Sequence, residues 1–204
     1  MTEVYKQIPL YRFLDYCNGH NRGNMILDCG AGGNQPPLSL FYENGFKTVG
    51  IEFSEEQLEA AQKYADKKKQ TLNIDSGDMR QLPFEDGAMD YVYSYNSVFH
   101  MMKKDVEKSV IEMKRVLKDN GLMFINFLST KDFRFGLGPD AGYHEYEQED
   151  DGIPVIHSYY EPNEAEKLFK DMQILYKEER VLERIFEGER IRQGFIDYIL
   201  IKKL

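Results

Sequence analysis

The sequence predicts a single domain of the α/β class, with a mostly parallel, doubly wound β-sheet between two layers of helices. Along the 204 residues, short apolar runs alternate with longer amphipathic segments, which is typical of repeated strand–helix–strand units. The nearly continuous apolar run 122–128 fits a strand that is buried on both faces of a parallel sheet. The length also suits one domain over 1–204, because domains usually hold about 100–200 residues.

The elements follow one another in regular order. Strands are expected over 25–29, 46–52, 71–75, 90–95 and 122–128. Helices are expected over 4–17, from Pro36 to Asn44, after the capping box of Ser54 and Gln57, and over 105–117. Pro9 argues against a continuous first helix, because proline lacks a backbone donor.

The last third of the chain departs from this alternation. Residues 129–160 predict a long loop, and a helix is expected after Glu161. The β-rich runs 173–186 and 190–202 flank Gly188 and predict a hairpin. We therefore expect an antiparallel C-terminal strand in the otherwise parallel sheet.

Composition excludes several classes of function. The 26 basic and 35 acidic residues give a net charge of -9, which disfavours nucleic acids and anionic membrane surfaces as partners. The two cysteines, Cys17 and Cys29, are too few for a disulfide framework or a structural zinc site. The N-terminus lacks the pattern of a secretion signal, so a cytoplasmic location is expected.

A glycine-rich turn follows the first strand and is the strongest functional signal. Asp28, Cys29, Gly30, Ala31 and Gly32 occupy this turn, where glycines allow a ligand to approach the backbone closely. The third glycine of a dinucleotide-binding fingerprint is missing, because Gln35 stands in its place. A carboxylate at Asp28 opposes a pyrophosphate and favours a ligand with a positive charge. Glu52 ends the second strand, where its carboxylate can accept hydrogen bonds from a ribose.

These motifs resemble those of the class I S-adenosylmethionine-dependent methyltransferases. The resemblance extends from about residue 24 to 128, with a weaker continuation to 204. It includes the turn 28–32, Glu52 and the segment 77–84, in the order typical of the family. The resemblance implies a Rossmann-like, three-layer α/β/α fold and S-adenosylmethionine as cofactor, with S-adenosylhomocysteine as product.

The resemblance also implies roles for individual residues. Asp28, Gly30, Ala31 and Gly32 would contact the cofactor, and Glu52 would bind its ribose. Asp78 would bond the adenine amino group, Met79 would offer its backbone amide, and Phe53 would lie against the adenine ring. Asn96 follows the fourth strand, where main-chain groups of the family approach the methionine part.

The acceptor side of the site is less well defined. His100 is the candidate catalytic residue, because it lies where the methyl acceptor would approach and because histidine can act as a base near neutral pH. The N-terminal helix 1–20 and the loop 129–160 are expected to cap the acceptor, and His157 and Tyr143 could line that cap. The acidic run 145–151 is interpreted as a solvated loop rather than a cation site. No helical pair of ligands supports a metal site, and none is expected.

The sequence therefore predicts transfer of a methyl group to an oxygen or nitrogen of a small molecule. The acidic charge and the lack of an Asn-Pro-Pro-Tyr motif after the fourth strand favour a small acceptor. One alternative is an NAD(P)-dependent oxidoreductase, which Asp28, Gln35 and the terminal hairpin disfavour. Another is a catalytically silent module that binds S-adenosylmethionine, which the cofactor motifs alone do not distinguish from an enzyme.

Overall fold

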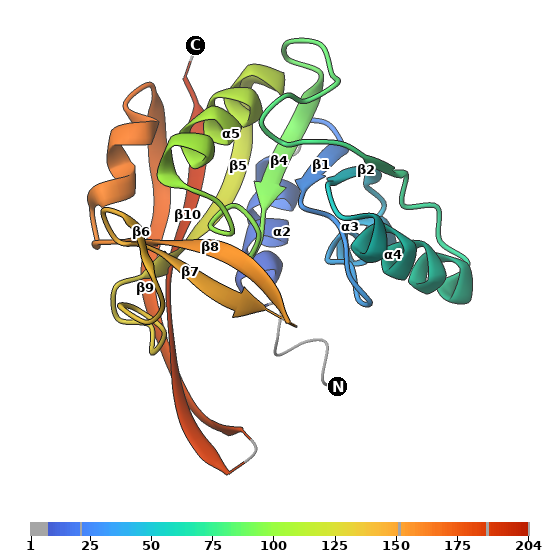
Figure 1. Ribbon diagram of the computed structural model, residues 1–204. Coiled ribbons are helices and arrows are strands. Elements are labelled where there is room, and N and C mark those ends of the chain that lie inside the picture. Colours follow the sequence, from blue (N-terminus) through green and yellow to red (C-terminus); the bar gives the residue numbers. More distant parts are fainter. Residues whose placement is uncertain (1–7, 21, 151, 187, 204) are drawn as a thin grey trace.

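The computed structural model describes residues 8–20, 22–150, 152–186 and 188–203 (Figure 1). The helices are α2 (Ile8–His20), α3 (Leu38–Glu43), α4 (Glu55–Lys68), α5 (Lys103–Val116) and the 3₁₀-helix η1 (Glu164–Phe169). The strands are β1 (Met25–Cys29), β2 (Lys47–Glu52), β3 (Ile74–Ser76), β4 (Met89–Ser94), β5 (Leu117–Ser129), β6 (Asp140–Gly142), β7 (Glu145–Asp150), β8 (Ile153–Tyr160), β9 (Met172–Phe186) and β10 (Glu189–Lys202).

The main sheet has the predicted mixed topology. Strands β3, β2, β1, β4 and β5 lie side by side and run parallel. Strand β10 pairs antiparallel with β5, with Phe195 opposite Leu128 and Ile201 opposite Leu122, and β9 pairs antiparallel with β10. The expected antiparallel C-terminal strand is therefore confirmed, and it lies beside β5.

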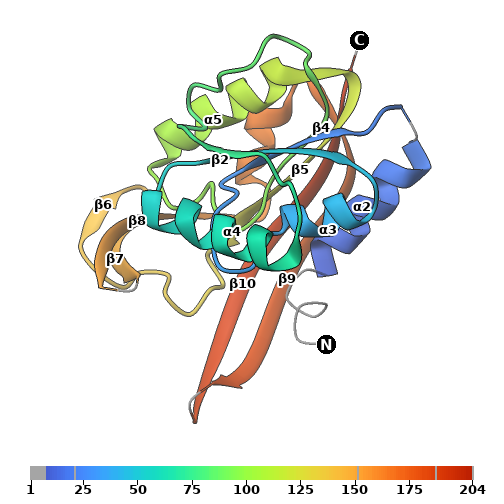
Figure 2. The ribbon, with the colours of Figure 1, turned by 90° about the vertical axis from the view of Figure 1, so that its right-hand side faces the viewer.

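Helices cover both faces of this sheet, as expected for a three-layer α/β/α fold. On one face, α5 and η1 pack through Val106, Val110 and Phe169. On the other face, α2, α3 and α4 pack against Tyr91, Tyr93 and Phe124 (Figure 2). Neighbouring residues of β4 and β5 alternate between these two cores, because successive side chains of a strand point to opposite faces.

The first helix is continuous over the described residues, despite its proline. Pro9 is the second residue of α2, where the first turn leaves backbone N–H groups unpaired and proline costs little. Leu10, Phe13, Leu14 and Cys17 of α2 are buried. The part of the predicted helix before Ile8 lies outside the described residues.

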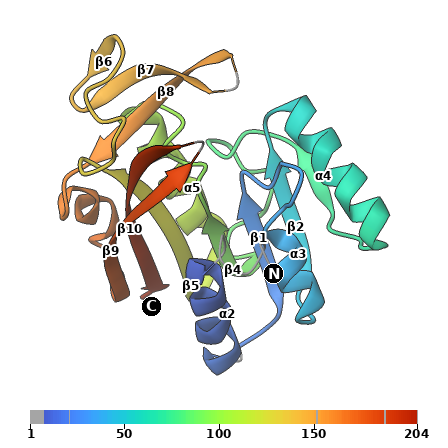
Figure 3. The same cartoon turned by 90° about the horizontal axis from the view of Figure 1, so that it is seen from below.

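The prediction of a loop over 129–160 is wrong. The segment contains β6, β7 and β8, which form a small antiparallel sheet (Figure 3). The end of β8 pairs parallel with the end of β5 through Tyr159 and Tyr160, which ties this small sheet to the main one. The described part of the acidic run, 145–150, is consequently a strand rather than a solvated loop. Its first carboxylate, on Glu145, is buried and accepts a hydrogen bond from the backbone N–H of Lys103.

Strands β9 and β10 form a hairpin that is longer than the rest of the sheet. Their free end extends away from the body of the molecule (Figures 1 and 2). Near this end Ile185 is 74% exposed, whereas Phe195 and Ile196 of the same hairpin are buried. The hairpin therefore contributes core residues at its base and exposed residues near its tip.

No helix in the described part of the chain is long and apolar enough to cross a lipid bilayer.

Candidate active site

A cavity of about 1500 Å³ includes residues that follow the carboxyl ends of β1, β2 and β4. Parallel α/β sheets bind ligands at this edge. The volume exceeds the roughly 300–1,000 Å³ typical of a pocket for one drug-sized ligand, so it has room for two ligands together. Glycine-turn and acidic residues line one part of it, and His100 lines another together with both apolar and charged side chains.

The glycine turn lies against the backbone of β2. The N–H groups of Gly30 and Ala31 both donate to the carbonyl of Ile51, at 2.9 and 3.1 Å. Gly30 has a φ of 92°, and a Cβ there would lie 1.9 Å from Oγ of Ser97. A side chain at this position would therefore clash as well as strain the backbone. Gly30 and Gly32 line the cavity, whereas Ala31 is fully buried behind them.

Glu52 joins the turn to the next helix. Its Oε2 accepts from the N–H of Gly32 at 2.9 Å, and its Oε1 accepts from the N–H of Ser54 at 2.8 Å. Ser54 in turn caps α4, with its hydroxyl accepting from the N–H of Gln57 at 3.4 Å. Glu52 lines the cavity, and each carboxylate oxygen has a second lone pair for a ligand.

The sequence predicted that Asp28 would contact the cofactor, but the structure places its side chain elsewhere. Its side chain is 1% exposed and lies next to the Tyr93 hydroxyl in the core, not in the cavity wall. The two-residue period of β1 puts Asp28 on the same face as Ile26, which packs in the α2–α3 core. Burial raises the pKa of Asp28 well above its usual value, and the charge of Glu52 adds to this effect.

The residues expected around the adenine meet at the same cavity. Phe53 is 73% exposed and lines the cavity together with Asp78 and Met79. The Asp78 carboxylate is held by Arg80, whose Nε and Nη2 donate to it at 2.6–2.9 Å. These hydrogen bonds lower the pKa of Asp78, so its carboxylate stays an acceptor for an amino group.

Asn96 also lines the cavity, in the turn that follows β4. It adopts a left-handed φ of 53°, and its side-chain oxygen accepts from Nδ2 of Asn126 at 2.7 Å. Its own N–H donates to the side-chain oxygen of Asn126 at 2.8 Å. These two reciprocal hydrogen bonds attach the turn that follows β4 to strand β5.

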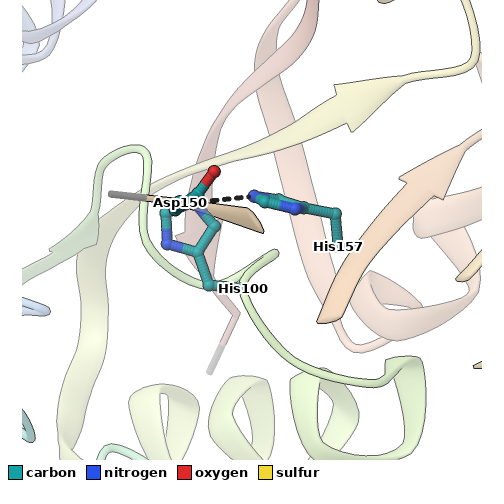
Figure 4. A group of neighbouring side chains, drawn as sticks. All are labelled: His100, Asp150 and His157. Atoms are coloured by element: carbon teal, nitrogen blue, oxygen red, sulfur yellow. Dashed lines mark ion pairs between the residues drawn. The ribbon is translucent and has the colours of Figure 1, made fainter. Parts of the chain in front are cut away.

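His100 lines the part of the cavity away from the glycine turn, and 41% of its side chain is exposed. Figure 4 shows its ring beside Asp150 of β7 and His157 of β8. The pKa of His100 is below its usual value, because desolvation and the neighbouring His157 disfavour the imidazolium. His100 is therefore a weaker base than an ordinary histidine.

Several cavity residues were not predicted from the sequence. Arg180 and Phe195 come from the hairpin, and Asp150 with Val155 come from the β7–β8 strands. Arg180 is held in place by Asp197, to which its Nε donates at 2.9 Å. The predicted hairpin brings residues 180 and 195 opposite each other, but no spacing in the sequence places them in the same cavity as His100. Tyr143, a predicted cap residue, is 68% exposed and stacks on His144 instead of lining the cavity.

Comparison with known proteins defines the class. The model of a family described as a methyltransferase domain matches residues 27–125, which run from β1 into β5. The PH0226 protein of Pyrococcus horikoshii has a similar fold, with a TM-score of 0.72 at 22% identity. That match covers 99% of this chain and 90% of the other.

Two named enzymes match in sequence. A sterol 24-C-methyltransferase of Pneumocystis carinii is 33% identical over 51% of this chain and 28% of its own length. The 27-O-demethylrifamycin SV methyltransferase of Amycolatopsis mediterranei is 28% identical over 58% of this chain and 44% of its own length. The chain thus matches less than half the length of these two relatives.

The fold is that of a class I methyltransferase. The match of residues 27–125 to the methyltransferase-domain family and the shared fold confirm the resemblance of the motifs to those of the class I S-adenosylmethionine-dependent methyltransferase family. The cofactor of this family is S-adenosylmethionine.

Proposed function

We propose that the chain transfers a methyl group from S-adenosylmethionine to a small-molecule acceptor bound in the same cavity. The observation that carries this proposal is the continuity of the cavity. Its wall includes Gly32, Glu52 and Asp78 as well as His100 and Phe195. A cofactor and an acceptor bound there would adjoin each other.

The described residues fit S-adenosylmethionine. Glu52 offers free lone pairs to ribose hydroxyls, and Asp78 offers an acceptor to the adenine amino group. Phe53 presents an exposed ring, and Met79 lies beside it in the cavity wall. When bound, the cofactor would supply a methyl group that is already activated on a sulfonium. Gly30, Gly32 and Asn96 would position its methionine part.

The acceptor part of the cavity supports a small molecule with apolar surface. Ile153, Val155, Leu182 and Phe195 line it, and Ile8 at the start of α2 adds to its wall. The small sheet and α2 thus form the sides of the acceptor site in this proposal. The net charge of -9 also favours such an acceptor over a nucleic acid. The two relatives named above carry a sterol and a rifamycin in their names, which are small molecules.

His100 is proposed to contact the reacting atom of the acceptor. Alignment of acceptor, methyl carbon and sulfur supplies most of the rate in a direct displacement, because the donor needs no further activation. A histidine with a lowered pKa adds less as a base than as a group that orients the acceptor.

Calorimetry tests the cofactor assignment. We expect S-adenosylmethionine and S-adenosylhomocysteine to bind, and NAD and NADP not to bind. Tight binding of NADP without binding of S-adenosylmethionine would show that the oxidoreductase alternative is correct.

A screen of small-molecule acceptors, scored by release of S-adenosylhomocysteine, then tests turnover. With the acceptor found, His100→Ala should lower kcat at least tenfold and leave cofactor affinity unchanged. Binding of the cofactor without turnover on any acceptor would favour the silent binding module.

A further inference from the structure

Three potential metal ligands from three separate segments converge at the edge of the cavity, where His100 and Asp150 line its wall and His157 is buried behind them. Nε2 of His157 lies 3.0 Å from Oδ2 of Asp150, and Nε2 of His100 lies 4.0 Å from the same oxygen. The three ligand atoms all lie within 4.8 Å of one another. Figure 4 shows the two rings and the carboxylate directed toward one another.

The surrounding structure holds two of these groups in place. The other oxygen of Asp150, Oδ1, accepts from Nη1 of Arg134 at 2.6 Å, and Nη2 of Arg134 donates to the carbonyl of Glu149. His157 is almost fully buried, and its Nδ1 has no hydrogen-bond partner among the described residues. Arg134 thus fixes the carboxylate through Oδ1 and leaves Oδ2 directed at the histidines. His100 is the more exposed member and can adjust its position.

The donor set selects a class of ion. Two imidazole nitrogens and one carboxylate oxygen suit Zn²⁺, Fe²⁺, Co²⁺ or Ni²⁺, whereas Mg²⁺ and Ca²⁺ prefer oxygen ligands alone. Metal–nitrogen bonds of about 2.0–2.1 Å span at most about 4.2 Å between two ligand atoms. At the tetrahedral angle that zinc prefers, the same two atoms lie about 3.4 Å apart. The widest separation, up to 4.8 Å, therefore needs a movement of about 1.4 Å, which the exposed ring of His100 can make.

We propose that His100, Asp150 and His157 bind a divalent transition-metal ion at the acceptor end of the cavity. Three protein ligands leave at least one coordination position open. His100 and Asp150 both line the cavity, so this position faces the space assigned to the acceptor. The ion would select acceptors with an oxygen or nitrogen that can coordinate it. This last step rests on the proposed function, whereas binding of the ion does not.

The metal site also refines the role of His100. In the absence of an ion, its ring would contact the acceptor directly. With an ion bound, His100 becomes a ligand, and the ion contacts the acceptor. The sequence analysis expected no metal site because it found no pair of ligands on one helix. The three ligands come instead from a turn and two strands.

The test uses the full chain without a histidine tag, treated with a chelator and titrated with Co²⁺ while its visible absorption is recorded. We expect one Co²⁺ per chain, displaced by Zn²⁺ and not by Mg²⁺. His100→Ala and Asp150→Asn should each weaken Co²⁺ binding more than tenfold, since even residues that only support a ligand change metal affinity about 10- to 100-fold.

The matched control is His20→Ala. His20 ends α2 and pairs with the carbonyl of Asn120, outside the cavity. Circular dichroism and S-adenosylmethionine affinity are measured for every variant, and both should equal the wild-type values. Failure of the wild-type protein to bind Co²⁺ or Zn²⁺ would overturn the proposal. Binding that survives in both site variants, or that His20→Ala weakens equally, would also overturn it. This experiment measures binding of the ion and not methyl transfer. A negative result would therefore overturn the metal site alone, and the acceptor screen would still test the proposed methyl transfer.

Discussion

Replacement of Phe13 by alanine is expected to lower the free energy of unfolding by about 3–5 kcal/mol. Phe13 is completely buried, and its ring lies 6.0 Å from that of Phe41, 6.2 Å from that of Tyr93 and 5.8 Å from that of Phe124. Alanine would remove these contacts and leave a cavity in the core beneath α2. Urea unfolding followed by circular dichroism measures the change.

Tyr11→Ala is the matched control, because Tyr11 lies on the same helix and is 40% exposed. We expect Tyr11→Ala to lower the free energy of unfolding by less than about 1 kcal/mol. Equal losses in the two variants would contradict a core role for α2.

This result would correct the interpretation of the N-terminal helix as only a cap. Leu10, Phe13, Leu14 and Cys17 place one side of α2 in the core, while Ile8 and Pro9 at its start line the cavity. A deletion of residues 1–18 would therefore unfold the domain rather than impair turnover alone. Point substitutions at Ile8 are the appropriate probes of its contribution to the acceptor site.

Glu52→Ala should weaken S-adenosylmethionine binding by about 1.5–3 kcal/mol, or about 10- to 150-fold. The substitution removes the acceptor proposed for the ribose hydroxyls. It also frees the N–H groups of Gly32 and Ser54, which the carboxylate now holds at 2.9 and 2.8 Å. Isothermal titration with the cofactor and with its demethylated product measures the loss.

Two further variants separate these effects. Glu52→Gln keeps one acceptor oxygen and the volume of the side chain, so an intermediate loss is expected. Glu55→Ala removes an exposed carboxylate three residues away that does not line the cavity, and it should leave the affinity unchanged. A Glu52→Ala protein that binds the cofactor as tightly as wild type would refute the proposed role of Glu52.

Local patterns predicted much of the parallel sheet and the cofactor side of the cavity. The first strand was predicted at Met25–Cys29, where the structure has it, because its apolar run and the glycine turn set both ends. Gly32, Glu52, Phe53 and Asp78 all line one cavity, since turns at neighbouring strand ends meet at one edge of a parallel sheet.

Other features depend on contacts that the sequence pattern does not show. The face of β1 that Asp28 occupies could not be predicted, because both faces of this strand are buried and no polar alternation marks them. The strands within 129–160 were missed because charged residues dominate β7, which makes this segment look like a loop. Its backbone pairs with that of β8, and the sequence pattern does not show this pairing. The group of His100, Asp150 and His157 forms only when these segments meet.

The antiparallel pairing of β5 with β10 has a consequence for synthesis on the ribosome. Leu122–Leu128 gains this neighbour only when distant residues such as Phe195 have been made. Until then, one edge of a strand made almost entirely of apolar residues stays unpaired, and such edges promote association between chains. We therefore expect nascent chains that end before β10 to need a chaperone, and to aggregate when released without one.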